Sequence, residues 1–124
     1  MEIKTPKDAL LKNVIKVREI TACYGANTVQ TWLMAWLVVL ANKLDLSITV
    51  SQAEETALYL IEELYMLNIA ELTLFFTKLV KGDYGSFYNK FNLHTIIQGA
   101  KKYRKSRGLI LRKLPTEMQR KLIN

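Results

Sequence analysis

Apolar side chains recur every three to four residues along almost the whole chain, which is the spacing that fills one side of an α-helix. Two such stripes are Ala53, Ala57, Leu60, Ile61, Leu64 and Ile69, Leu72, Phe76, Leu79, Val80. The alternation typical of half-buried strands is almost absent. Half of the 124 residues are hydrophobic, and this length has room for one packed domain. The sequence therefore predicts an all-α fold, a compact single-domain bundle of five to six helices over residues 1–124.

Turn and capping residues predict where the first helices begin and end. The first is expected over Lys7–Ile20 with Pro6 at its start, and the second runs from Asn27 or Thr28 to about Leu44. A third is expected to begin at Ser51, because Ser51-Gln52-Ala53-Glu54 has the S-x-x-E form of a capping box. Asn68-Ile69-Ala70-Glu71 repeats this logic for a fourth helix, and Gly82 is expected to close that helix in the left-handed conformation.

Beyond Gly82, the same reasoning predicts three more segments. Asp83 is expected to cap a short helix ending near Phe91, in which Gly85 permits a close backbone approach. Asn92 is expected to cap a helix that ends at Gly108, and a last helix runs from Pro115 or Thr116 to Leu122.

Four aromatic residues, Tyr84, Phe87, Tyr88 and Phe91, share one side of the short helix predicted over 83–91. A hydrophobic wedge that closes the core is the favoured interpretation, because Phe75 and Phe76 are near in sequence. The functional alternative is stacking on unpaired bases. Tyr84 and Tyr88 are the candidate residues for stacking or for an interface.

Charge is distributed unevenly along the chain. Residues 1–68 carry six Lys and Arg against eight Asp and Glu, whereas residues 69–124 carry twelve against three. Seven cations and no acid fall between residues 101 and 113, partly on a predicted helix. Cations on a rigid element suit contact with phosphates. The candidate nucleic-acid-binding residues are Lys101, Lys102, Arg104, Lys105, Arg107, Arg112 and Lys113. A solvated face, or pairing with Glu54, Glu55, Glu62 and Glu63 of a neighbouring subunit, remains an alternative.

Residue patterns for catalysis or metal binding do not occur. The sequence has no P-loop, G-x-G-x-x-G, H-E-x-x-H or nucleophile elbow. His94 is the only histidine, and the acidic run of Glu54, Glu55, Glu62 and Glu63 lacks Glu-x-x-His spacing, which favours a solvated face. The lone Cys23 is expected to be a small buried filler. We therefore predict a non-enzyme with no catalytic residue, metal or cofactor.

The longest apolar run, Trp32–Ala41, is well short of the ~20 residues that cross a bilayer. No membrane partner is predicted. The amino terminus lacks the pattern of a secretory signal, and a single cysteine fits a reducing compartment, so a cytoplasmic location is expected.

Three short motifs resemble those of a known family. They are E-L-x-x-F-F from Glu71, G-D-Y-G-S-F-Y from Gly82, and K-Y-R-K-S-R from Lys102. The pattern G-x-Y-G-x-x-Y followed by Y-x-x-x-R is similar to that of small, uncharacterised bacterial and phage-borne helical proteins. The likeness covers about residues 51–107. It implies a phage or mobile-element setting and no established activity.

Two functional hypotheses follow. The first is a non-enzymatic accessory protein that binds nucleic acid non-specifically through its basic carboxy-terminal helix. The alternative is a protein-interaction module, a loader, inhibitor or adaptor of a host protein, that uses its hydrophobic second helix or its aromatic residues. A homo-oligomer is compatible with both hypotheses.

Overall fold

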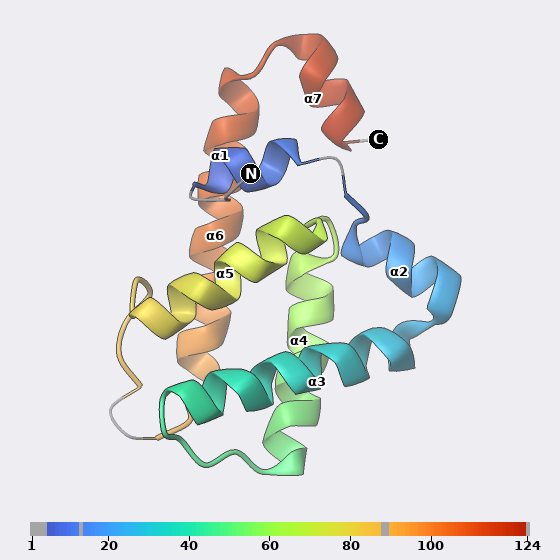
Figure 1. The fold of residues 1–124 in the computed structure, drawn as a ribbon. Helices are drawn as coiled ribbons and strands as arrows, with labels where there is room; N and C mark the ends of the chain where they lie inside the picture. Colours follow the sequence, from blue (N-terminus) through green and yellow to red (C-terminus); the bar gives the residue numbers. More distant parts are fainter. Residues whose placement is uncertain (1–4, 13, 88–89, 124) are drawn as a thin grey trace.

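The computed structural model describes residues 5–12, 14–87 and 90–123, and within these ranges the chain forms seven α-helices and no β-strand (Figure 1). The all-α prediction is confirmed, although the helices number seven rather than five to six. They are α1 (Pro6–Leu11), α2 (Val17–Tyr24), α3 (Ala26–Lys43), α4 (Val50–Leu64), α5 (Ile69–Lys81), α6 (Leu93–Lys113) and α7 (Thr116–Ile123).

The helix predicted over Lys7–Ile20 is instead two helices, and the described residues between them, 12 and 14–16, are not helical. The backbone at the start of α2 and just before it pairs with the turn between α4 and α5. The Val17 N–H donates to the Leu67 carbonyl at 2.8 Å, and the Ile69 N–H donates to the Ile15 carbonyl at 3.0 Å. These bonds give partners to backbone groups that a continuous helix would have paired internally. Pro6 begins α1 as expected.

Helix α4 begins at Val50, one residue earlier than predicted, because a different capping box forms. The Thr49 hydroxyl accepts from the Gln52 N–H at 3.1 Å, and the Gln52 side chain accepts from the Thr49 N–H at 2.9 Å. Thr49-x-x-Gln52 therefore caps the helix, and Ser51 lies within it. The predicted stripe is otherwise correct, since Ala53, Ala57, Leu60 and Leu64 are buried.

Both predicted ends of α5 are confirmed. Asn68 is its N-cap: its side chain accepts from the Glu71 N–H at 2.8 Å, and Glu71 Oε1 accepts from the Asn68 N–H at 3.2 Å. Gly82 closes the helix with φ 82°, in the left-handed region that favours glycine.

The short helix predicted over 83–91 is absent from the described residues: 82–84 form a turn, and neither 85–87 nor 90–92 is helical. Its aromatic residues nevertheless face inward: Phe87 and Phe91 are buried and Tyr84 is half-buried, while Tyr88 lies outside the described residues. Gly85 is needed for its φ of 115° rather than for a close approach, because a Cβ there would meet nothing within 4 Å.

Asn92 caps α6 as predicted, accepting from the His94 N–H at 2.9 Å. The helix does not end at Gly108 but continues to Lys113. A glycine weakens a helix by ~1 kcal/mol without stopping it. Leu114, which directly follows α6, is buried, and its burial favours continuation of the helix beyond Gly108.

The helices pack around one hydrophobic core. Helix α3 packs on α2, α4 and α5, while α6 packs on α1, α4 and α5. Figure 1 shows α6 extending past α5 and α1 towards α7, which folds back beside its end. None of the helices in the described ranges is long and apolar enough to span a membrane.

Candidate functional site

Arg107, one of the seven predicted phosphate contacts, lies inside the protein. Its Nε donates to Glu71 Oε2 at 2.8 Å, and the two side chains are 10% and 1% exposed. Arg107 Nη2 also donates to the Met66 carbonyl at 3.4 Å. The prediction for Arg107 is therefore corrected: its charge is paired within the molecule, and it ties α6 to α5.

Glu71 joins this ion pair to the cap of α5. Burial raises the pKa of the Glu71 carboxyl, and the Arg107 guanidinium and the Asn68 N–H oppose that rise by stabilising the ionised form. The Asn68 side-chain amide in turn donates to the carbonyls of Ala9 at 3.0 Å and Lys12 at 3.3 Å. One polar cluster thus connects α1, α5 and α6.

One aromatic residue from each of the three sequence motifs takes part in a cluster of rings centred on Phe75. Tyr103 meets Phe75 edge-on with ring centroids 6.1 Å apart, and Tyr84 lies 5.8 Å from the same ring. Tyr84 also covers Gly99 of α6, where an added Cβ would be 2.8 Å from its ring. Burial raises the pKa of Tyr84 to about 12. The ring of Tyr84 therefore packs against the core rather than standing free to stack on a base.

Five of the predicted phosphate contacts lie together on the exposed side of α6. With 3.6 residues per turn, Lys101, Lys105 and Arg112 fall within about 40° around the helix axis, and Lys102 and Lys113 widen the arc to about 120°. All five are exposed. The buried residues Ile96, Ala100 and Tyr103 occupy the other side. We call these five cations the basic face; they span roughly 18 Å along the helix.

Arg104 is at the border of the basic face. Its Nη1 lies 2.8 Å from Glu63 Oε2 on α4, although 44% of the side chain is still exposed. The sequence allowed for pairing of the basic tract 101–113 with glutamates of a neighbouring subunit. The contact of Arg104 with Glu63 joins the same kinds of residue, but within one chain. A carboxylate therefore already partly neutralises Arg104.

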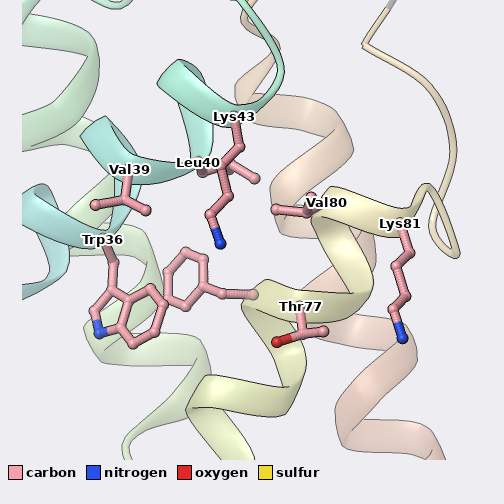
Figure 2. Close-up of a pocket in the computed structure, with 8 residues that line it drawn as sticks. Trp36, Val39, Leu40, Lys43, Thr77, Val80 and Lys81 are labelled. Carbon is pink, nitrogen blue, oxygen red and sulfur yellow. The ribbon is translucent and has the colours of Figure 1, made fainter.

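A groove between α3 and α5 is the second surface feature of interest (Figure 2). Its floor is the stack of Trp36 on Phe76, with ring centroids 5.1 Å apart and planes 5° from parallel. Val39 and Val80 extend its apolar lining, and its volume is about 120 Å³.

Lysines are the charged residues that line this groove in the described part of the chain. Lys43 and Lys81 end α3 and α5 respectively. Lys43 extends from α3 towards α5, and Lys81 extends from the end of α5 (Figure 2). An apolar floor with ammonium groups at its border is complementary to an apolar side chain flanked by carboxylates.

The remaining sequence candidates do not assemble into a site for chemistry. Across residues 5–12, 14–87 and 90–123, no three His, Cys, Asp or Glu side chains come close enough to hold a metal ion. His94 is exposed in the first turn of α6. Cys23, expected to be buried, is exposed near the end of α2.

Comparisons with known protein families, with curated proteins and with solved structures find no match to this chain. The likeness to small bacterial and phage-borne proteins stays a prediction from the motifs.

Sequence reasoning missed the internal role of Arg107, the contact at Gly99 and the groove. A signal for Arg107 was present, because it lies four residues after Tyr103 and seven after Ala100 and so continues the apolar stripe of α6.

Proposed function

We propose that the protein binds nucleic acid non-specifically through the basic face of α6: Lys101, Lys102, Lys105, Arg112 and Lys113. The observation that carries the proposal is the gathering of these five exposed cations within one arc of a helix that is anchored to the core on its opposite side. Arg107 has no part in binding, and Arg104 is secondary because of Glu63.

Counterion release provides the binding energy in this proposal. A polyanion that meets several fixed cations releases its condensed counterions, which favours association without any reading of sequence. The helix holds the five Cα atoms in place, so little backbone entropy is lost on binding. Binding does not require a helix of the protein to enter a groove of the nucleic acid, and it does not require Tyr84 to stack on a base. Discrimination between sequences is therefore expected to be weak.

The proposal is tested by fluorescence anisotropy with short labelled single-stranded DNA, duplex DNA and RNA at about 50 mM salt. Lys101→Gln, Lys105→Gln and Arg112→Gln are combined in one variant. We expect it to bind each probe at least about tenfold more weakly than the parent chain.

The matched control combines Lys7→Gln, Lys12→Gln and Lys90→Gln, which removes the same charge from exposed positions outside the basic face. This control is expected to retain most of the binding. Equal losses in the two triple variants would show that net charge, and not the basic face, drives association. Absence of binding by the parent chain at low salt would refute the proposal.

A further inference from the structure

The groove between α3 and α5 has room for one apolar side chain. Its volume is about 120 Å³, and a cavity of about 150 Å³ is enough to hold benzene. Val39 is 44% exposed at its border, although its neighbours on the inner side of α3 are fully buried. An apolar side chain seated against Trp36 and Phe76 would remove this surface from water.

The outer side of α4 carries a surface of the complementary kind. Leu58 and Tyr59 are 53% and 47% exposed, and Glu55 and Glu62 lie beside them on the same exposed side of α4. Residues three and four apart are neighbours on a helix, so Glu55 and Glu62 flank Leu58 on its two sides along the axis. We call Glu55, Leu58, Tyr59 and Glu62 the α4 ridge.

We propose that the groove between α3 and α5 binds the α4 ridge of a second copy of this chain. In that contact Leu58 enters the groove, and Glu55 and Glu62 lie near Lys43 and Lys81 of the other copy. Charge complementarity selects this occupant: the charged residues that line the groove are lysines, the charged residues of the ridge are glutamates, and each surface also has apolar side chains.

A groove of one copy that holds the ridge of the next makes a head-to-tail, heterologous contact. A pair then leaves one groove unused on one copy and one ridge unused on the other, and these can add further copies until the ring closes or the array ends. An array of copies would also present several basic faces to one polyanion, which raises the overall binding by avidity. The self-association itself does not depend on nucleic acid.

Light scattering coupled to size exclusion, over a range of protein concentrations without nucleic acid, tests this proposal. The mass of the parent chain is expected to rise with concentration. Val39→Glu puts a carboxylate in the groove, and Leu58→Glu puts one at the centre of the ridge. Each variant is expected to weaken self-association at least about tenfold.

Mixing these two variants provides the decisive observation. The Leu58→Glu chain keeps an intact groove and the Val39→Glu chain keeps an intact ridge, so the mixture should form pairs of two chains and nothing larger. The two altered surfaces are both acidic and do not replace the lost contact.

Val38→Glu is the matched control, because Val38 is also 44% exposed on α3 but does not line the groove. It is expected to associate like the parent chain. Association weakened equally by Val38→Glu, or a mixture that stays monomeric, would overturn the proposal. A parent chain that stays monomeric at every concentration would also overturn it. In that case, Val39-dependent binding of a synthetic helical peptide of Glu and Leu would assign the groove to a foreign acidic partner.

Discussion

Two glycines inside α6 give matched substitutions with opposite expected effects on stability. At Gly99, an added Cβ would lie 2.8 Å from Tyr84 Cδ2, 3.0 Å from its Cγ and 3.2 Å from its Cβ. At Gly108, an added Cβ would meet nothing within 4 Å. Tyr84 has little freedom to move away, because its ring also packs on Phe75.

The magnitudes follow from two general effects. Replacing a helical glycine by alanine favours folding by up to ~1 kcal/mol, which is the whole effect expected for Gly108→Ala. Overpacking a filled contact costs ~1–3 kcal/mol. Gly99→Ala combines both effects, so the change in its free energy of unfolding should lie between zero and a loss of ~2 kcal/mol. The free energies of unfolding of the two variants should therefore differ by ~1–3 kcal/mol.

Urea unfolding, followed by circular dichroism and tryptophan fluorescence, measures both values, provided that the denaturant slopes are unchanged. A double-mutant cycle isolates the contact with the ring: in a Tyr84→Ala background, Gly99→Ala should cost less than in the parent chain, because only the 3.2 Å contact with the Cβ of residue 84 remains. If Gly99→Ala stabilises the parent chain as much as Gly108→Ala does, the Tyr84 ring does not cover α6 and the reasoning is refuted.

Three further predictions concern buried polar groups. Glu71→Gln leaves Arg107 buried without its charged partner and should lower the free energy of unfolding by ~3–5 kcal/mol. The double variant Glu71→Gln with Arg107→Met should recover part of that loss. A loss under ~1 kcal/mol for Glu71→Gln in urea unfolding would contradict the buried pair. The Tyr103 hydroxyl is buried and bonds to no described residue, so Tyr103→Phe should be neutral or stabilise by up to ~1 kcal/mol, and a clear loss of stability would show that the hydroxyl has a partner. Burial raises the pKa of Tyr84 to about 12, against about 10 when unfolded. Its contribution to stability is therefore complete below the unfolded pKa and is lost as pH rises from there through the folded pKa. The alkaline loss of stability should be smaller in Tyr84→Phe, and identical pH profiles would contradict the shift.

Much of the fold follows from local signals in the sequence. Three helix ends depend on residues that are close in the sequence, and all three were predicted correctly. Asn68 and Glu71 begin α5, Gly82 ends it, and Asn92 begins α6. Prediction failed where distant backbone intervened. The predicted first helix breaks before Val17, where the Ile15 carbonyl accepts from the Ile69 N–H and the Val17 N–H donates to the Leu67 carbonyl, a pairing that local periodicity does not encode.

The candidate surfaces likewise depend partly on local sequence signals and partly on long-range contacts. The cations of the tract were found from composition, whereas the partner of Arg107 is Glu71 of another helix, a contact that the local sequence does not encode. Phe76 belongs to a predicted apolar stripe, and Trp36 lies in the longest apolar run of the sequence. The groove that they line depends on how α3 packs on α5, which is a long-range contact.

The salt dependence of binding to duplex DNA is the most direct measurement of the proposed function. If the five cations of the basic face each contact a phosphate, a plot of log Kobs against log[NaCl] has a slope no steeper than about −4.5. The combined Lys101→Gln, Lys105→Gln and Arg112→Gln variant should reduce that slope by about 2.7. The control altered at Lys7, Lys12 and Lys90 should leave it unchanged. An equal slope in parent and α6 variant would contradict the account.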